Sequence, residues 1–274
     1  MKKYIPTLFR LIHKSKEENL SLAANDMTYK LLLALFPFIM FVMAVLGFFN
    51  LDIYYITDNL NDFIPTEIIG LVEIFIKDIV NVRRPNLLSF SILLTLYSSS
   101  SGFMSLITGI NKAHHLEDRR NFIKIYLVSF LMVLTFTLAL AVSIVGIVFS
   151  TLIIETIGHI FTISLFSVVL YNFLLFVISL GIIIFAVVVL MRLALVKKLR
   201  LKELLPGAIF TTLGWIISSF GFNIYVTNWS NMSSVYGSVG TFMVLMLWLN
   251  LICNVILLGA GLNAVLIEEK NEQF

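Results

Sequence analysis

The sequence predicts an all-α integral membrane protein whose domain is a bundle of six membrane-spanning helices. Of its 274 residues, 59% are hydrophobic and only 13% are charged, and the mean hydropathy is +0.98, values far from those of soluble domains. Between Glu203 and Glu268 the chain contains no Asp, Glu, Lys, Arg or His. That stretch holds two apolar runs of more than about 20 residues, the length that crosses a bilayer core. It is therefore expected to form a membrane-embedded helical hairpin.

Three segments are expected along the chain. Residues 1–26 are basic, and their apolar positions keep to one side of a helix, which predicts a short amphipathic helix on the membrane surface. Residues 268–274 form a short tail. Between them, residues 27–267 form the transmembrane domain, with spans at about 27–49, 87–110, 123–150, 168–192, 204–227 and 238–267. The first apolar run lacks a small-residue cleavage site, so we expect it to remain as a span and not to be a cleaved signal peptide.

The first predicted span carries opposite charges at its start and a proline in its middle. Asp26 and Lys30 are four residues apart, which suits a side-chain pair on one helix face. An ion pair that anchors the helix at the interface is favoured over a proton relay. Pro37 removes a backbone donor and is expected to kink the helix. Such breaks lie near sites in many transporters, although packed kinks are common too.

The longest hydrophilic connection, residues 51–86, contains an amphipathic pattern after Pro65. Thr66 is a suitable N-cap, and Pro85 follows the end of the pattern. At about 16 residues this helix is too short and too amphipathic to span. We expect it to lie on, or dip into, the extracytoplasmic surface of the membrane.

Two predicted spans carry a stripe of small and polar residues, spaced at alternating steps of four and three along one helix face. In the second span the stripe consists of Ser91, Thr95, Ser98, Gly102, Ser105 and Gly109. In the fifth span it consists of Gly207, Thr211, Gly214, Ser218 and Gly221. Small residues let helix backbones approach closely in a membrane, so helix packing is the favoured role. The wall of a polar cavity is the alternative.

The last predicted span contains three amide side chains. Asn250 and Asn254 are one turn apart, and Asn263 lies further on. An amide that faces lipid is costly, so these side chains are expected to face protein or water. Hydrogen bonding between helices is favoured over contact with a substrate.

The basic residues are unevenly divided between the two sides of the predicted bundle. With six spans, one side receives both termini and the connections at 112–124 and 192–203. That side holds all of the 19 Lys and Arg residues except Lys30, Lys77, Arg83 and Arg84. The positive-inside rule then places both termini in the cytoplasm.

The sequence gives little support to a metal site or an enzyme. Cys253, the single cysteine, lies within the last apolar run, so an intrachain disulfide is impossible. His114 and His115 are adjacent and would point in different directions on a helix, and Glu155 and His159 have no third ligand nearby. Nuclease chemistry needs clustered carboxylates or a metal facing water, and no hydrophilic segment exceeds about 36 residues. We therefore expect no enzyme activity, no cofactor and no nucleic-acid partner.

Three stretches carry a resemblance to a known family. The first runs from Ala24 through Tyr29 and Leu32 to Pro37, in ANDMTYKLLLALFP. The second is SGFMSLITGIN, which ends at Asn111. The third runs from Pro206 and Gly207 through Tyr225, Tyr236, Gly237 and Trp248 to LLGAGLNAVL. In these stretches the chain resembles the YihY/virulence factor BrkB family of bacterial inner-membrane proteins, once mislabelled as ribonuclease BN.

The resemblance implies six transmembrane helices and a location in the bacterial plasma membrane, and it supplies no catalytic residues. Relatives often carry an acidic residue in LLGAE where this chain has Gly261, so a role of that carboxylate is not carried over.

Together these features favour a transporter-like bundle that handles a lipid, an envelope precursor or a small solute. The parts that would serve it are Pro37, the two small-residue stripes, Asn250 and Asn254. The second to sixth spans have almost no internal Asp, Glu or Lys, which disfavours proton coupling and favours a lipid or amphiphile in a polar groove. The alternative is a membrane scaffold or regulatory protein of the cell envelope that docks through residues 66–82 and 228–234. Membrane lipids are expected partners, and a homo-oligomer is left open.

Overall fold

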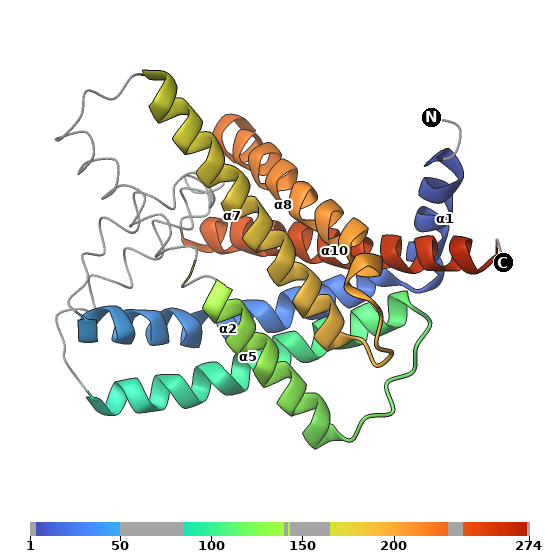
Figure 1. Ribbon diagram of the computed structural model, residues 1–274. Helices are drawn as coiled ribbons and strands as arrows, with labels where there is room; N and C mark the ends of the chain where they lie inside the picture. The colour runs from blue at the N-terminus through green and yellow to red at the C-terminus, as the bar shows by residue number, and fades with distance from the viewer. Residues whose placement is uncertain (1–3, 50–84, 140–141, 143–164, 230–237, 273–274) are drawn as a thin grey trace.

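The computed structural model describes residues 4–49, 85–139, 142, 165–229 and 238–272, and the elements in these ranges are helices without any strand (Figure 1). The all-α class is therefore confirmed for the described part of the chain. In chain order the helices are α1 (Tyr4–Glu17), α2 (Leu20–Phe49), α5 (Pro85–Ala113), the unlabelled 122–139 helix (Phe122–Ala139), α7 (Leu165–Ala194), α8 (Leu201–Trp229) and α10 (Ser238–Glu272).

Four of these helices contain segments long and apolar enough to cross a membrane: Phe122–Ala139, Val169–Ala194, Leu201–Thr227 and Phe242–Glu272. They overlap the spans expected at 123–150, 168–192, 204–227 and 238–267, and most of 140–150 lies outside the described residues. Helices α2 and α5 cover the two other expected spans, so the total of six stays a prediction. Helix α2 begins at Leu20, so residues 20–26 belong to it and not to the N-terminal helix. The amphipathic helix expected at 66–82 lies outside the described residues.

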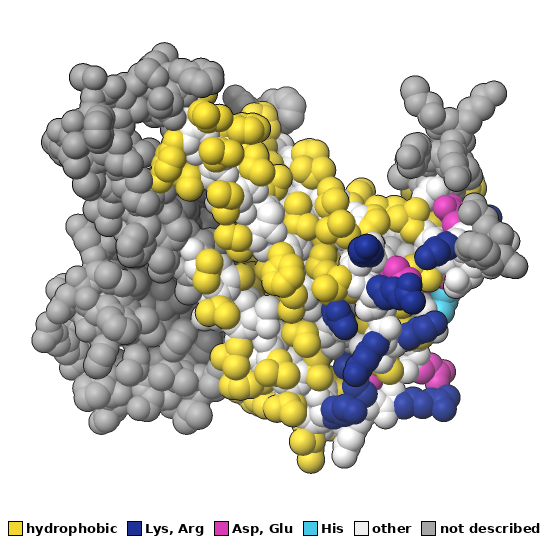
Figure 2. Space-filling view, in the orientation of Figure 1, with side chains coloured by type: hydrophobic (Ala, Val, Ile, Leu, Met, Phe, Trp, Pro, Cys, Tyr) yellow, Lys and Arg dark blue, Asp and Glu magenta, His cyan; other side chains and the backbone are white. Residues whose placement is uncertain are grey.

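The outer surface of the long helices is apolar, as a lipid environment requires. Large side chains such as Ile178, Phe185 and Ile217 are 57%, 63% and 70% exposed. Only 6% of the most apolar window of Val169–Ala194 is buried inside the protein. Figure 2 shows hydrophobic side chains as a broad zone across the middle of the molecule. Soluble monomers rarely expose contiguous apolar patches of such extent, so this zone is suited to contact with lipid.

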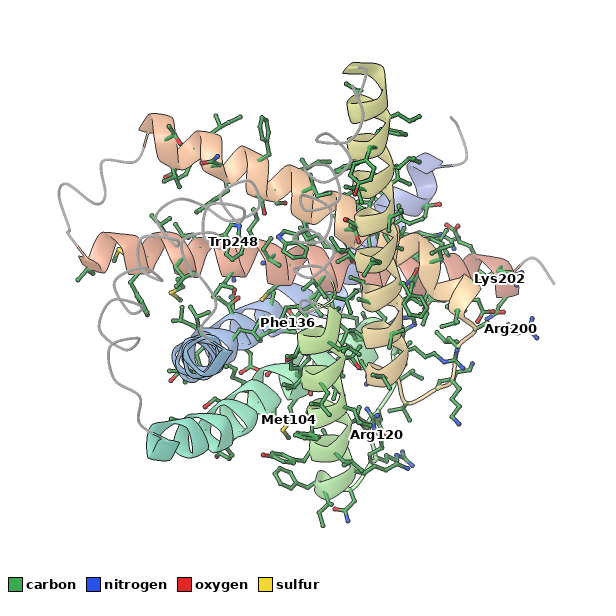
Figure 3. The ribbon with its side chains drawn as sticks, turned by 60° about the vertical axis from the view of Figure 1, so that its left-hand side comes forward. Met104, Arg120, Phe136, Arg200, Lys202 and Trp248 are labelled. Atoms are coloured by element: carbon green, nitrogen blue, oxygen red, sulfur yellow. The ribbon has the colours of Figure 1, made fainter. Side chains whose placement is uncertain are left out.

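The buried core lies toward the end of the molecule that holds both chain termini (Figure 1). It combines the first turns of α2 and α8, the last turns of α5 and α7, part of the 122–139 helix, and the middle of α10. Its largest fully buried apolar side chains are Leu20, Ile107, Ile110, Met132, Met191, Leu204 and Leu257. Lys and Arg side chains gather at the same end in Figure 2, and Figure 3 places Arg120, Arg200 and Lys202 there. The charged end and the apolar middle are thus separated along the helix axes.

Helix α1 packs on the C-terminal end of α10. Thr7 donates a hydrogen bond to Glu269 Oε1 at 3.0 Å, and Arg10 pairs with Glu272 at 2.9 Å. Lys14, whose side chain is 6% exposed, pairs with Glu268. The predicted N-terminal helix is therefore present, but two of its basic residues bind acidic residues of α10. On the opposite face of α1, Phe9 and Ile12 are 73% and 49% exposed. If α1 lies on the membrane surface, as predicted, this is the face that contacts the membrane.

Candidate functional site

Polar side chains surround α2 one turn and a half after its start. The Asp26 carboxylate accepts a hydrogen bond from Lys30 Nζ at 2.8 Å and another from Ser105 Oγ of α5 at 2.6 Å. The ion pair expected from the i,i+4 spacing is thus formed, and a residue of the α5 stripe holds it in place. Ser105 is 3% exposed, whereas the side chains of Asp26 and Lys30 are 53% and 34% exposed. The buried Ser105 hydroxyl therefore anchors the Asp26–Lys30 pair on its protein side, and the other side of the pair is exposed.

The opposite side of the same turn of α2 bonds to α10. Asn250 Nδ2 donates to Asn25 Oδ1 at 2.7 Å and to Thr28 Oγ1 at 3.3 Å. Asn254 Nδ2 in turn donates to Asn250 Oδ1 at 3.1 Å. The expected role of these two asparagines, hydrogen bonding between helices, is what Asn250 does here. We call the full set the polar belt; its members are Asn25, Asp26, Thr28, Lys30, Ser105, Asn250 and Asn254.

The α5 stripe lies against two different helices. A Cβ atom at Gly102 would lie 2.7 Å from Leu31 Cδ2 of α2, and one at Gly109 would lie 2.7 Å from Leu257 Cδ2 of α10. Gly102 and Ser105 are buried and Ser98 is half-buried. Ser91 and Thr95 fall within α5, and Pro37 falls within α2, but their side chains lie outside the described part. The described end of this stripe is a packing surface with one polar contact, from Ser105 to Asp26.

The α8 stripe packs on α10 over its first half and then leaves the interface. A Cβ atom at Gly207 would lie 2.2 Å from the Gly259 carbonyl oxygen, and one at Gly259 would lie 2.0 Å from Thr211 Oγ1. A Cβ at Gly214 would lie 2.7 Å from Val255 Cγ1. By contrast, a Cβ at Gly221 would meet nothing within 4 Å, and Ser218 is only half-buried. The α5 and α8 stripes therefore face α2 and α10, not each other, at these glycines.

Asn263 of α10 binds the backbone of α8 on both sides of Pro206. Its Oδ1 accepts a hydrogen bond from the Gly207 N–H at 2.6 Å, and its Nδ2 donates to the Leu204 carbonyl at 3.0 Å. Pro206 has no N–H and disturbs the helical hydrogen-bond ladder around it. A buried amide that supplies both a donor and an acceptor satisfies the backbone there. The sequence indicated that Asn263 faces protein or water, but it did not predict that its hydrogen-bond partners lie in the backbone of α8.

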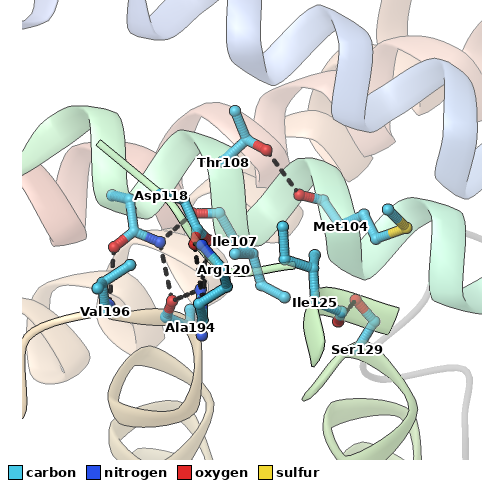
Figure 4. Close-up of polar contacts among 10 residues, drawn as sticks. Met104, Ile107, Thr108, Asp118, Arg120, Ile125, Ser129, Ala194 and Val196 are labelled. Atoms are coloured by element: carbon cyan, nitrogen blue, oxygen red, sulfur yellow. Dashed lines mark hydrogen bonds and ion pairs between the residues drawn. The ribbon is translucent and has the colours of Figure 1, made fainter. Parts of the chain in front are cut away.

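Asn111 joins the end of α5 to the end of α7. Figure 4 shows the polar contacts around Ala194 and Val196 at this junction. Asn111 Nδ2 donates to the Ala194 carbonyl at 2.8 Å, and Asn111 Oδ1 accepts from the Val196 N–H at 2.9 Å. Arg120 Nη2 also donates to the Ala194 carbonyl at 2.8 Å, which places a cation at the negative end of the α7 dipole. The Arg120 guanidinium, bonded to Asp118, lowers the pKa of that carboxyl. Sequence reasoning missed this junction, although Asn111 stands directly after a small-residue stripe.

Comparison with known proteins decides the family. The profile of the family described as virulence factor BrkB matches residues 11–274. The chain belongs to the BrkB family. It is 31% identical to the ribonuclease-like protein YfkH of Bacillus subtilis (strain 168) over 249 residues, 89% of each chain. It is also 34% identical over 71 residues, 26% of this chain and 24% of the other, to a UPF0761 membrane protein of Pseudoalteromonas translucida (strain TAC 125). No solved structure matches. Family and apolar helices together identify a membrane protein.

In this BrkB-family chain, some residues of the ANDMTYKLLLALFP stretch of α2 lie in the core and others lie on the surface. Ala24 and Leu32 are buried, at 0% and 5% exposure, so packing accounts for them. Tyr29 is 57% exposed and lies beside Lys30. At 100° per residue, the exposed face of Leu22, Tyr29 and Leu33 lies between the Asp26–Lys30 side and the Asn25–Asn250 side of the polar belt. Tyr29 is thus placed for contact with a molecule outside the core.

His114 lies just after the end of α5, outside the predicted spans. Its Nε2 atom is buried without a hydrogen-bond partner, near the Lys14–Glu268 pair and His115. Burial lowers the pKa of its imidazole to about 4, and the neighbouring Lys14 charge acts in the same direction. No group of three or more His, Cys, Asp or Glu residues able to hold a metal occurs in the described ranges. His114 is therefore a neutral, half-buried imidazole whose Nε2 atom is enclosed by the protein.

This imidazole predicts a pH-dependent stability. Below pH 6.5 the unfolded chain takes up a proton at His114, whereas the folded chain does so only near pH 4, so stability falls as the pH drops between these values. The loss between pH 7 and pH 5 amounts to about 2 kcal/mol. Thermal unfolding in detergent at both pH values should show a smaller acid-induced shift for His114→Gln than for the native chain. The exposed His13→Gln is the control, and equal shifts in all three proteins would contradict the prediction.

Proposed function

We propose that this protein is a transporter-like, multi-pass protein of the bacterial plasma membrane that handles a lipid or a similar amphiphile at the polar belt. The observation that carries the proposal is the Asp26–Lys30 pair, fixed by Ser105 and open to the outside where α2 enters its apolar run. Ionisable side chains within a membrane segment are rare, and where they occur they are candidate functional sites.

The chemistry of the polar belt suits a headgroup that carries both signs of charge or several polar groups. Lys30 offers an ammonium and Asp26 a carboxylate, 2.8 Å apart, and Asn250 adds an amide on the other side of α2. Between them the exposed Tyr29 and Leu33 continue into the apolar part of the helix. An amphiphile with its headgroup at the belt would have its tail along this apolar face.

The basic residues at the end with both termini support a cytoplasmic position for that end, by the positive-inside rule. The polar belt then belongs to the cytoplasmic part of the membrane. We propose further that the protein is not an enzyme. The ribonuclease-like description of YfkH is not extended to this chain, because the polar belt holds one carboxylate, paired with an amine, and not the clustered carboxylates of a nuclease.

The proposal is tested in liposomes that contain the purified protein. We expect the native protein to move fluorescent phospholipid between leaflets faster than empty liposomes do. Asp26→Asn, Lys30→Gln and Asn250→Leu should each slow this movement at least tenfold. An exposed i,i+4 pair contributes only about 0.3–0.5 kcal/mol, so the charge variants should keep the melting temperature of the native protein.

The matched control is Lys16→Gln, which removes an exposed cation of α1 outside the polar belt. It should leave the rate unchanged. No lipid movement by the native protein, together with no movement of nucleotide sugars, osmolytes or ions, would reject transport. The membrane scaffold would then be supported if one stoichiometric protein partner were crosslinked in cells.

A further inference from the structure

The described Lys and Arg residues fall into a paired and an unpaired set. Arg10, Lys14, Lys30, Arg119 and Arg120 each form an ion pair with Asp or Glu. The unpaired cations among the described residues are concentrated in one short segment. Its members are Arg192, Lys197, Lys198, Arg200 and Lys202, which are all exposed. We call residues 192–202 the basic loop.

Glu203, the acidic residue nearest in sequence, forms no ion pair with the described cations of this segment. Glu203 Oε2 accepts a hydrogen bond from the Arg200 backbone N–H at 2.9 Å. This hydrogen bond caps the N-terminus of α8. The Glu203 carboxylate therefore binds a backbone N–H and not a side-chain cation. Among the described residues, the five cations of the basic loop have no ion-pair partner and are open to solvent.

Buried side chains and hydrogen bonds from α5 and Arg120 hold the backbone of the basic loop in place. Leu195 and Leu199 are buried, at 4% and 8% exposure. Asn111 binds the Ala194 carbonyl and the Val196 N–H, and Arg120 binds the same carbonyl. A surface whose backbone is fixed before binding loses less conformational entropy when it binds a partner. Figure 3 shows Arg200 and Lys202 projecting outward from this end of the molecule.

The basic loop also lies between two candidate spans. It connects the candidate spans Val169–Ala194 and Leu201–Thr227, so its cations are within a few residues of apolar helix on both sides. Val196, Leu201 and Leu205 are 40%, 41% and 43% exposed in the same stretch. Cations interleaved with exposed apolar side chains at a span boundary match the region where headgroups meet acyl chains.

We infer that the basic loop is a binding surface for anionic phospholipid headgroups of the leaflet at the terminal end of the bundle. Charge complementarity and the position between two candidate spans favour a lipid over a nucleic acid. A basic side chain close to an anionic membrane surface strengthens attraction by about fivefold. The fixed backbone directs several such side chains to one surface at once.

The test compares lipid binding by the full-length protein in detergent, with short-chain phosphatidylglycerol and phosphatidylcholine as probes. The native protein should prefer phosphatidylglycerol, and a variant with Lys197, Lys198, Arg200 and Lys202 changed to Gln should lose at least tenfold of that preference. Inorganic phosphate at the same concentration should not displace the lipid. The control changes Lys16, Lys112, Lys124 and Lys270 to Gln, which removes the same charge from unpaired cations outside the loop.

The control should keep the preference. The measurement reads lipid binding by the loop and not lipid movement at the polar belt, so the two proposals can fail separately. Equal losses in the loop variant and the control would show an effect of net charge alone and overturn the inference. An unchanged preference in a folded loop variant would overturn it as well. So would an RNA oligonucleotide that binds the native loop more tightly than phosphatidylglycerol, or displacement by inorganic phosphate.

Discussion

Replacing Gly207 by alanine is expected to destabilise the folded protein by about 3 kcal/mol or more, the upper range for overpacking a tight contact. The added Cβ would lie 2.2 Å from the Gly259 carbonyl oxygen and 2.4 Å from Asn263 Nδ2. The first neighbour is backbone and cannot rotate away. The second is held by its hydrogen bond to the Leu204 carbonyl, and the same amide accepts from Gly207 N–H. Relief of the clash requires that α8 and α10 move apart.

The same helix provides the control for this prediction. A Cβ at Gly221 would meet no atom within 4 Å, so Gly221→Ala should be neutral or stabilising by about 0.5–1 kcal/mol through helix propensity. Thermal unfolding in detergent, followed by the fraction of monodisperse protein after heating, measures both variants. A Gly207→Ala protein as heat-resistant as the native protein would show that α8 and α10 are not packed backbone to backbone.

Replacing Asn111 by leucine is expected to cost about 2–3 kcal/mol, because buried backbone groups lose their partners. Asn111 is 1% exposed and bonds to the Val196 N–H and to the Ala194 and Ile107 carbonyls. Leucine has the same number of side-chain heavy atoms but is bulkier, so no cavity is left and overpacking adds to the loss of the hydrogen bonds. The connection between α7 and α8 should also become more sensitive to protease, since Asn111 fixes its first residues.

Asn223→Leu is the matched control for Asn111→Leu. Asn223 is an exposed residue of α8 whose side chain has only a 3.4 Å contact with Thr227 Oγ1. Surface substitutions of this kind usually change stability by less than about 0.5 kcal/mol. If the two leucine variants melted at the same temperature, the junction between α5 and α7 would not have the role assigned to Asn111.

The long helices could be predicted from the sequence because their signals are local. An apolar run such as that of residues 168–192 has the length of a span, and the structure shows a helix there. The Asp26–Lys30 pair was equally predictable, because an i,i+4 spacing fixes which side chains meet on one helix. Asn111 and Gly207 could be singled out as an amide and a small residue in apolar stretches, but residue type alone did not predict which atoms they contact.

The partners could not be predicted because they depend on the register between helices far apart in the chain. Arg10 and Glu272 are separated by 262 positions, and nothing in either local pattern indicates that they pair. Steps of four and three made Gly207 and Gly221 equivalent, yet one lies against a backbone carbonyl and the other against open space. Gly259, which completes the contact with Thr211, belongs to a different helix and gave no signal of its own.

The central claim is that the chain crosses the membrane six times with both termini in the cytoplasm. Cys253 is the single cysteine and is fully buried, so a Cys253→Ala background allows single reporter cysteines. Glu117→Cys and Lys198→Cys lie in the two connections expected inside, and Asp58→Cys lies in the connection expected outside. A membrane-impermeant maleimide should label position 58 in intact cells and positions 117 and 198 only after permeabilisation. Labelling of position 117 or 198 in intact cells would contradict the topology on which the proposals rest.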